Sequence, residues 1–282
     1  MDKAFKEIFD QVFNEYKKTP IDIFGNGKGE VETQELEVLK LTYERTIRDI
    51  TNYFKPVVRN FEDIKILEIG PWVGFVSTVL KRIGFNISVQ EIPDFVCQKN
   101  LKAHFENEQI NYSPVNLRHY KLPFHNEEFD AIIMCEVLEH LNFNPLPVLS
   151  EINRILKMDG LYYLSLPNLV SLPNRLKFLF GKSVNTPIQK FFDQLKPGTS
   201  EIIGIHWREY TTEEIRQLLE ATSFHITRQY LFHHGHIRNP ILKLLLFLPY
   251  KFLPGLLPNQ TTLAIKTENC QYDFFFSDVT KF

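Results

Sequence analysis

The stretch Ile66–Gly74, which reads ILEIGPWVG, decides the fold of this chain. It consists of a short apolar run, an acidic residue and a turn with two glycines, and a helical pattern begins after it near Val76. A buried strand that turns into a helix in this way presents backbone N–H groups and the positive end of the helix dipole to a ligand. The stretch therefore predicts a binding site for a nucleotide-like ligand.

The middle of the turn is occupied by Trp72, which stands between Gly70 and Gly74. In the dinucleotide fingerprint G-x-G-x-x-G, the second glycine lets the backbone approach a pyrophosphate. An indole at this point blocks a pyrophosphate, so the sequence argues against a nicotinamide dinucleotide. It favours a ligand with a smaller or more apolar group there, and leaves open whether the indole covers that group or turns back into the core.

The next predicted strand ends on an acid. The segment ISVQEIPD places Glu91 at that end, and an acid about 20 residues after the first strand holds ribose hydroxyls in nucleotide-binding folds. We therefore expect Glu91 to bind a ribose.

Short apolar runs alternate with helical patterns from residue 64 onward. This alternation is typical of βαβ units and a parallel sheet. We predict an α/β fold with a doubly wound, Rossmann-like, mostly parallel sheet of seven strands. The strands are expected near residues 64–69, 86–91, 111–116, 129–134, 161–166, 225–232 and 261–267.

The chain divides into a cap and a main domain. Two amphipathic segments precede the first strand, and they predict a helical N-terminal cap at residues 1–60, followed by the main domain at 61–282. The alternation fails at about 169–209, so this stretch is predicted to be an insertion after the fifth strand that covers the substrate. Four phenylalanines are expected either to line an apolar acceptor pocket or to seal the insertion onto the core: Phe178, Phe180, Phe191 and Phe192.

Composition limits the partners and the compartment. The 282 residues carry a formal net charge of −2, so nucleic acid is not expected as a partner. Three scattered cysteines without a C-x-x-C pair, and an amino terminus that lacks the apolar core of a signal peptide, predict a cytoplasmic protein. Residues 241–258 are apolar but broken by lysines and prolines; a helix packed on the domain is expected, with contact to a membrane surface as the alternative.

Several motifs together resemble the class I S-adenosylmethionine-dependent methyltransferases, in the branch whose fourth strand carries an F-D…E-H-L pattern. They are ILEIGPWVG, ISVQEIPD, LPFHNEEFDAIIMCEVLEHL, EINRILKMDGLYYLSLPN and HWREYTTEEIRQLLEATSF, in that order. The resemblance extends from about Ile64 to Thr267. It implies that S-adenosylmethionine is the cofactor, that residues 61–282 form a methyltransferase domain, and that the last strand, QTTLAIKT, is antiparallel.

The resemblance also implies roles for single residues. Glu68, Gly70 and Gly74 would form the loop around the methionine end of the cofactor, with Trp72 in that loop. Glu91 would accept hydrogen bonds from both ribose hydroxyls, and Ile92 would lie against the adenine. At the adenine edge the resemblance places Asn116 and Leu117. Near the methionine amino group and the transferable methyl it places Cys135 and Glu136.

The candidate catalytic residues follow from the position of the strand ends. Ligands bind outside the carboxyl ends of the strands in an open parallel sheet, which selects Glu136, Glu139 and His140 after the fourth strand, with His206 at the end of the insertion. Of these, Glu136, His140 and His206 are the candidate catalytic residues. His140 is a candidate base or substrate contact; the alternative is a structural hydrogen bond that fixes the loop after the fourth strand. The histidines of HHGH, residues 233–236, lack a spaced carboxylate partner, so no metal site is predicted.

Methyl transfer requires alignment of the nucleophile, the methyl group and sulfur, and an oxygen nucleophile also requires a base. We expect transfer to a hydroxyl, or as second choice an amine, of a small-molecule, sugar or glycan, or lipid-type acceptor. The alternative is a catalytically inactive binding or scaffold protein with the methyltransferase fold, which Trp72 and the lack of an obvious base suggest. The sequence makes no prediction of oligomeric state.

Overall fold

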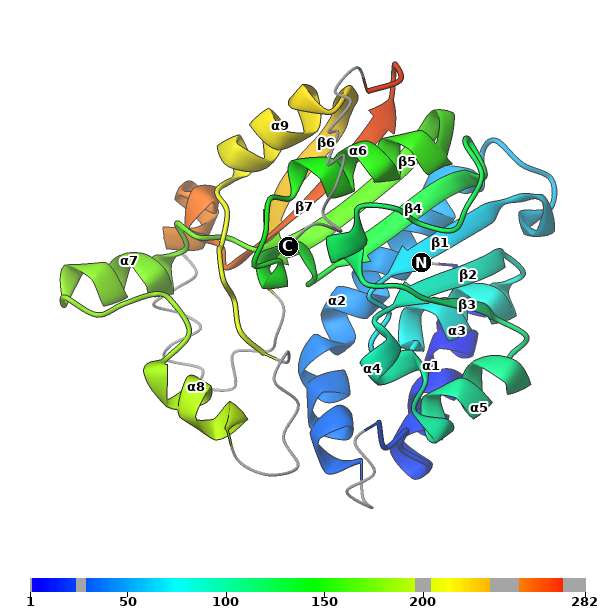
Figure 1. The fold of residues 1–282 in the computed structure, drawn as a ribbon, viewed down its shortest axis with the longest axis horizontal. Coiled ribbons are helices and arrows are strands. Elements are labelled where there is room, and N and C mark those ends of the chain that lie inside the picture. Colours follow the sequence, from blue (N-terminus) through cyan, green and yellow to red (C-terminus); the bar gives the residue numbers. More distant parts are fainter. Residues whose placement is uncertain (1, 24–28, 196–203, 234–248, 271–282) are drawn as a thin grey trace, which may run out of the picture.

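The computed structural model describes residues 2–23, 29–195, 204–233 and 249–270 (Figure 1). Its centre is one sheet with the strand order β3-β2-β1-β4-β5-β7-β6. The strands are β1 (Lys65–Ile69), β2 (Asn86–Glu91), β3 (Asn111–Pro114), β4 (Phe129–Cys135), β5 (Leu156–Pro167), β6 (Phe224–Phe232) and β7 (Asn259–Lys266). The pairs between β1, β2, β3, β4 and β5 are parallel, whereas β7 runs antiparallel to β5 and β6. The predicted fold class, including the antiparallel last strand, is confirmed.

One boundary was wrong. The fifth strand was expected at 161–166, but β5 begins at Leu156, directly after α6 (Leu146–Ile155). Leu156 pairs with Phe129, and the register shifts before the regular pairing resumes at Leu161 opposite Ala131. The apolar run that marked the strand in the sequence begins only after this irregular segment.

Helices cover both faces of the sheet, and each face has its own core (Figure 1). On one face, α6 and α9 (Thr212–Ala221) pack on alternate strand residues that include Leu67 and Ile132. On the other face, the core contains Ile66 and Ile133. It is covered by α1 (Lys3–Lys18), α2 (Glu30–Phe54), α3 (Phe75–Ile83), α4 (Pro93–Val96) and α5 (Lys99–Asn107). Period-two alternation along the strands thus places successive residues in different cores.

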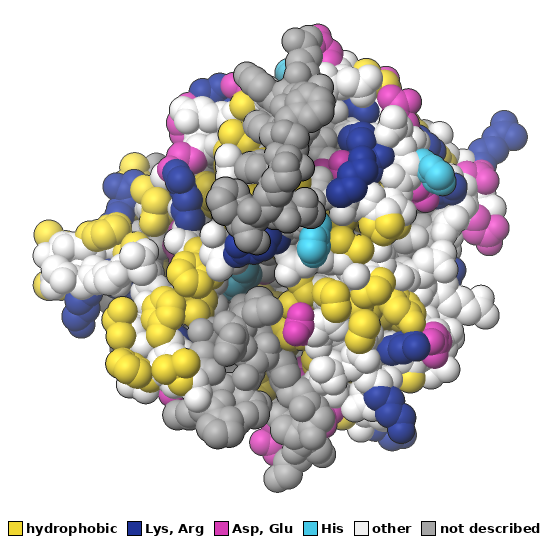
Figure 2. Space-filling model, in the orientation of Figure 1, with side chains coloured by type: hydrophobic (Ala, Val, Ile, Leu, Met, Phe, Trp, Pro, Cys, Tyr) yellow, Lys and Arg dark blue, Asp and Glu magenta, His cyan; other side chains and the backbone are white. Residues whose placement is uncertain are grey.

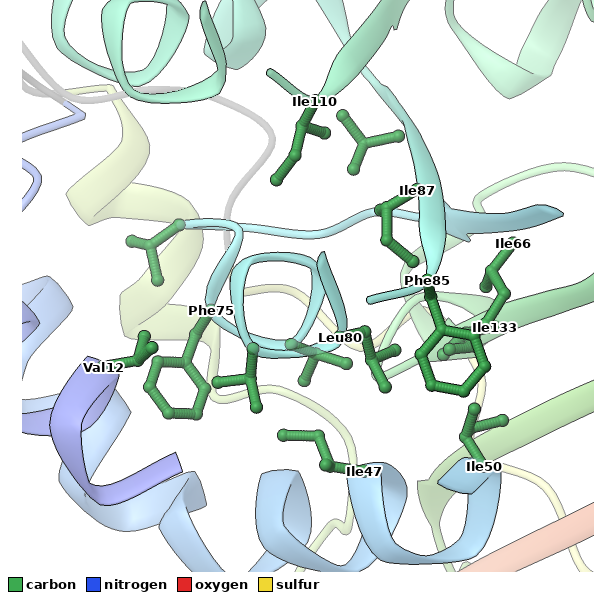
Figure 3. Close-up of a cluster of buried hydrophobic side chains, with 14 of the residues drawn as sticks. Val12, Ile47, Ile50, Ile66, Phe75, Leu80, Phe85, Ile87, Ile110 and Ile133 are labelled. Carbon is green, nitrogen blue, oxygen red and sulfur yellow. The ribbon is translucent and has the colours of Figure 1, made fainter. Parts of the chain in front are cut away.

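The two N-terminal helices share a core with the sheet. Phe75, the first residue of α3, packs edge-on against Phe9, Phe13 and Tyr16 of α1, at ring-centroid distances of 5.3, 6.0 and 5.4 Å. Figure 3 shows Val12 of α1 and Ile47 and Ile50 of α2 pointing toward the same cluster. Burial of this apolar surface is the main force that holds the helices on the sheet.

The insertion after β5 contains two short helices, α7 (Leu172–Leu179) and α8 (Ile188–Gln194), which extend to one side of the sheet (Figure 1). Phe178, Phe180 and Phe192 are 59%, 72% and 59% exposed. These three side chains do not seal the insertion onto the core, so that expectation was wrong for them; the apolar acceptor pocket stays a prediction. Figure 2 shows hydrophobic side chains gathered at the surface over α8.

The segment 241–258 is described only in part. Residues 241–248 lie outside the described residues, as do His234 and His236 of the HHGH segment. The described remainder is helical at 249–252 and at η4 (Pro254–Leu256), and Phe252 and Leu253 are mostly exposed. Among the described residues, the helices are too short or too polar to cross a membrane.

Candidate functional site

The glycine turn after β1 is built around two glycines with left-handed backbone conformations. Gly70 has φ +67° and Gly74 has φ +75°. A Cβ atom on Gly70 would lie 2.4 Å from Cγ2 of Val137, and one on Gly74 would lie 2.5 Å from Cε1 of Phe105. Both positions therefore require glycine for conformation and for packing. Their amides are already used, because Gly70 N donates to Gln90 O at 2.9 Å and Gly74 N donates to Pro71 O at 2.8 Å.

Trp72 links this turn to the end of β2. Its own φ is +53°, and its backbone N–H donates to Oε2 of Glu91 at 3.3 Å. The indole packs edge-on against Phe95 of α4 at 5.5 Å and lies against the first core. The ring thus packs against α4 and the first core, and whether it also covers part of the cofactor stays a prediction. Trp72 is half-buried as a whole, and it is its backbone N–H that lies beside Glu91.

Glu91 and Glu68 are buried carboxyls held by hydrogen bonds. Oε1 of Glu91 accepts from the Ile92 N–H at 2.8 Å, in addition to the bond from Trp72. The Ser77 hydroxyl donates to Glu68. Burial raises the pKa of each carboxyl to about 7, and the hydrogen bonds partly offset this shift. Two accepted N–H bonds leave lone pairs on Glu91 for ribose hydroxyls.

The remaining predicted cofactor residues follow β2 and β3. Ile92 is half-buried against the first core, and Leu117 is buried in the second. Asn116 caps η2 (Leu117–His119), because its Oδ1 accepts from the Arg118 N–H at 2.9 Å. The ends of β1, β2 and β3 thus bring together the residues that the resemblance assigned to the cofactor (Figure 1). Their contacts with a ligand stay predictions.

Cys135 and Glu136 follow at the end of β4. The Cys135 thiol lies 3.9 Å from the hydroxyl of Thr46 on α2, and burial raises its pKa well above the ordinary value. A thiol that stays protonated is a poor nucleophile, so Cys135 is not suited to nucleophilic attack. Glu136 has φ +56°, and its backbone N–H donates to Ser165 O of β5 at 2.8 Å.

Four side chains meet at this end of β4, and we call them the β4-end cluster: Glu136, Glu139, His140 and His206. The rings of His140 and His206 meet edge to face at 4.9 Å. One ligand atom from each of Glu139, His140 and His206 lies within 4.8 Å of the others. His140 and His206 were both predicted site residues, and the structure brings them together although 65 residues of chain separate them.

The electrostatics of the cluster follow from burial. Glu139 is fully buried, and burial together with the charge of Glu136 raises its pKa well above the ordinary value. Burial, and next the charge of His206, lowers the pKa of His140 to about 4, so its imidazole is neutral at pH 7. Burial raises the pKa of Glu136 to about 7, against the lowering effect of the nearby His206.

The insertion holds His206 in the cluster. Its backbone N–H donates to the hydroxyl of Thr186 at 2.9 Å, between α7 and α8. The next residue, Trp207, donates its N–H to Glu139 O at 2.8 Å. On the ring, Nδ1 lies 3.2 Å from Oε1 of Glu209, whose other oxygen accepts from Asn174 of α7 at 2.9 Å.

The sequence reasoning missed Glu209, Asn174 and Thr186. The spacing His206-x-x-Glu209 is a local signal that was available for the first of them. Asn174 and Thr186 carry no local signal, because only the return of the chain after the insertion brings them to His206.

The fold and the site define a class. A sheet of this order, with a glycine turn after β1, a buried acid at the end of β2 and a polar cluster after β4, is the arrangement of Rossmann-like enzymes that bind a nucleoside cofactor at the strand ends. Residues 40–229 match the sequence family described as a methyltransferase domain, which covers more than half of the chain. The chain belongs to this family, and it is a methyltransferase that uses S-adenosylmethionine.

Comparisons with individual proteins agree. A curated relative, the mitochondrial ubiquinone biosynthesis O-methyltransferase of Dictyostelium discoideum, is 23% identical over 123 residues, 40% of this chain and 38% of the relative. Among solved structures, a Pyrococcus horikoshii protein aligns with a TM-score of 0.54 at 17% identity, over 90% of this chain and 98% of that one. An S-adenosylmethionine-dependent methyltransferase from Archaeoglobus fulgidus aligns with a TM-score of 0.53 at 15% identity, over 83% of this chain and 98% of that one. Such similarity shows the fold.

Proposed function

We propose that the chain transfers a methyl group to a hydroxyl oxygen of a small-molecule, glycan or lipid-type acceptor, which meets the β4-end cluster. The observation that carries the proposal is the cluster itself. Two carboxyls and two imidazoles lie together directly after β4. Glu68 is the next-to-last residue of β1 and Glu91 is the last residue of β2, at the strand ends where cofactors of this fold bind.

Several residues of the chain fit the cofactor. The buried Glu91 carboxylate keeps acceptor capacity for two ribose hydroxyls, and the narrow turn at Gly70 and Gly74 leaves no room for side chains. When bound, S-adenosylmethionine supplies a methyl group whose bond to sulfur breaks as the bond to the acceptor oxygen forms, with the electron pair left on sulfur. The thiol of Cys135 and the hydroxyl of Thr46 form part of the wall beside this position.

The chain must also take up the proton that the acceptor hydroxyl releases. Glu136 is the residue that we assign to this task, because it directly follows β4 and its backbone is fixed by the bond to Ser165. It is half-buried, so its carboxylate can pass the proton on to solvent. A positioned base of this kind contributes about 10²–10⁴-fold to the rate. An amine acceptor is the second choice, since it needs the same alignment.

The surroundings of the cluster support an acceptor with an apolar part. Phe191 of α8 stacks edge-on with Trp207 at 5.8 Å, next to His206. The curated relative is named for ubiquinone biosynthesis and for O-methylation, which agrees with a hydroxyl on a lipid-type acceptor. Contact with a membrane surface through exposed Phe178, Leu179 and Phe180 would suit such an acceptor. Failure to co-sediment with anionic vesicles would exclude that contact.

Transfer of a labelled methyl group tests the proposal. The purified chain is incubated with labelled S-adenosylmethionine and a lysate extract separated into lipid, glycan and small-molecule fractions. We expect label in one fraction, in a product that resists mild acid as an ether does and that fails to form with Glu136→Gln. Label on protein alone, or no label with any fraction, would exclude the proposal, and the second result would favour the inactive scaffold.

A further inference from the structure

Arg45 of α2 carries a charge that no acid of the described part of the chain pairs with. Its guanidinium lies over two aromatic rings of β6, with the central carbon 4.3 Å from the ring centroid of Phe232 and 5.8 Å from that of Tyr230. Its Nε is buried and has no hydrogen-bond partner among the residues that the structure describes. Asp49, one turn further along α2, accepts instead from the Tyr230 hydroxyl and from Arg48. A buried donor without an acceptor is costly, so Arg45 calls for a ligand.

A second buried donor without a partner lies beside Phe232. Asn259 of β7 pairs with Phe232 in the sheet, and residues that pair across two strands point to the same face. Asn259 is 2% exposed, and its amide nitrogen has no hydrogen-bond partner among the described residues. Two donors without an acceptor therefore meet on the face that Arg45 covers. An oxyanion satisfies such a pair, because its oxygens accept from both.

The charge around these donors is positive. A further guanidinium, that of Arg228, lies 4.6 Å from the ring centroid of Tyr230. The contacts around this ring thus bring three arginines, Arg45, Arg48 and Arg228, against one acid, Asp49. The chain as a whole has a net charge of −2, so the positive charge is local. It favours a negatively charged ligand.

The two donors lie at the carboxyl edge of the sheet. β6 runs parallel to β5, because both are antiparallel to β7, so its last residue, Phe232, lies at the same edge as the end of β4. β6 is the outer strand, three places from β4 in the sheet (Figure 1), or roughly 14 Å at the usual strand spacing. Helix α2 joins the two places, since Thr46, next to Arg45, lies 3.9 Å from the Cys135 thiol.

We propose that Arg45 and Asn259 bind an anionic group of the methyl acceptor, a carboxylate or a phosphate. The planar guanidinium fork matches the oxygens of both groups. The inference rests on the proposed function, in which the acceptor hydroxyl lies at Glu136. The hydroxyl and the anionic group are then roughly 14 Å apart, so the acceptor is an elongated molecule.

Position argues against the carboxylate of the cofactor as the anion. The family resemblance places the methionine end of the cofactor at the glycine turn after β1. In the sheet, β1 and β6 are four places apart, which is roughly 19 Å. The acceptor side of β4 is the nearer one.

Binding of small anions tests the site without any acceptor. The full chain, saturated with S-adenosylhomocysteine, is titrated by calorimetry with inorganic phosphate, with acetate and with acetamide, the neutral counterpart of acetate. We expect one phosphate or one acetate per chain and no binding of acetamide, and the tighter of the two anions indicates which group the acceptor carries. Arg45→Gln and Asn259→Leu should each weaken anion binding at least about tenfold, because each removes a hydrogen bond to a charged group.

Arg48→Gln is the matched control, because it removes the same charge from the same helix and leaves the contact between Arg45 and Phe232 in place. It should change the anion affinity less than about threefold, since salt screens a charge that does not touch the ligand. Binding of S-adenosylhomocysteine shows that each variant is folded. An equal loss of anion affinity in Arg48→Gln and Arg45→Gln, or no binding of either anion to wild type, would overturn the proposal. A loss of S-adenosylhomocysteine affinity in Arg45→Gln as large as the loss of phosphate affinity would assign Arg45 to the cofactor instead.

The charge of the methylated product separates this inference from the proposed function. Labelled product made from the lysate fractions is passed over an anion-exchange resin at neutral pH, and we expect the resin to retain it until salt is added. A labelled product that flows through would contradict the anionic acceptor and leave methyl transfer to a hydroxyl standing. Absence of any labelled product would contradict the proposed function, whereas the titrations with phosphate and acetate would still decide whether Arg45 and Asn259 bind an anion.

Discussion

Two pairs of carboxyls at the strand ends differ in their hydrogen-bond partners. Glu68 and Glu91, in the last two residues of β1 and β2, each accept hydrogen bonds from a hydroxyl or from backbone amides. Glu139, after β4, is fully buried, and its carboxyl is hydrogen-bonded to that of Glu136. Both regions lie along the same edge of one sheet, so the difference is local.

The comparison separates binding from chemistry. A carboxylate whose position is fixed by amides is suited to hold neutral hydroxyls, because its geometry is set before the ligand arrives. Two buried carboxyls that are bonded to each other cannot both be ionised, so the pair retains a proton. Variants in the two regions should therefore fail in different assays.

The largest expected effect is on turnover. Glu136→Gln removes the proton acceptor, and we expect methyl transfer to fall by about 10²–10⁴-fold. Affinity for S-adenosylhomocysteine should change less than about threefold by calorimetry. Glu106→Gln, on the exposed side of α5, should match wild type in both assays. A loss of affinity as large as the loss of turnover would place Glu136 in the cofactor site instead.

The opposite pattern is expected for Glu91→Ala. Loss of two charge-assisted hydrogen bonds costs about 3 kcal/mol, so the dissociation constant for S-adenosylhomocysteine should rise about 100-fold. Glu139→Gln is the counterpart in the other region, and it should leave that constant nearly unchanged. If the two variants bind the cofactor product equally well, the division between the regions is wrong.

Packing of the glycine turn can be tested by stability. Gly74→Ala places a methyl group 2.5 Å from Phe105 on a backbone with φ +75°, and we expect a loss of about 3 kcal/mol in the free energy of unfolding. Gly181→Ala is the control, because Gly181 has φ +66° but no atom within 4 Å of the added carbon. It should lose only about 1 kcal/mol. Urea unfolding measures the free energy of unfolding of both variants. Equal losses in the two variants would show that the Phe105 side chain moves away from the added methyl group.

The smallest expected effect is the change with pH in the affinity for S-adenosylhomocysteine. Burial raises the pKa of Glu91 from its ordinary value of 4.5 to about 7, so the carboxylate becomes protonated as the pH falls below 7. S-adenosylhomocysteine should bind up to about tenfold more weakly at pH 6 than at pH 8. The free energy of unfolding depends on pH in the opposite direction to the binding of S-adenosylhomocysteine. A raised pKa stabilises the apo fold below pH 4.5, and this contribution disappears as the pH rises through 7.

Glu91→Gln isolates the contribution of Glu91 to the pH dependence of binding, because glutamine does not titrate. Its affinity for S-adenosylhomocysteine should be lower than that of wild type at pH 8 and should vary less between pH 6 and pH 8. An unchanged slope would assign the titration to another group, with Glu68 the first to examine, since its pKa is also raised to about 7.

The fold could be predicted because its signals are local. Each strand is an apolar run, and the turn at Gly70 and Gly74 needs glycine whatever surrounds it. The place of the acids Glu68 and Glu91 was also predictable, since they lie at the ends of strands that pair directly in the sheet; their contacts with the cofactor stay predictions. In these cases a short stretch of sequence determines both the backbone conformation of a segment and the position of that segment in the sheet.

The second half of the site depends on the return of the chain after α8. The hydrogen bonds that hold His206 beside His140 run through the Thr186 hydroxyl and the backbone N–H of Trp207, which stand in no periodic pattern. The lean of Trp72 onto Phe95 is likewise a matter of packing between a turn and a short helix. Such contacts are set by the whole fold, so a single sequence without structure cannot give them.

The chain has two tryptophans, and one stands in each region of the comparison. Trp72 is bonded through its amide to Glu91, and Trp207 is 48% exposed beside the β4-end cluster. Each indole therefore serves as a built-in optical probe of its own region. With Trp207→Phe, the remaining emission reports arrival of the nucleoside, and with Trp72→Phe it reports events at the histidines, so the order in which the two regions fill can be followed in real time.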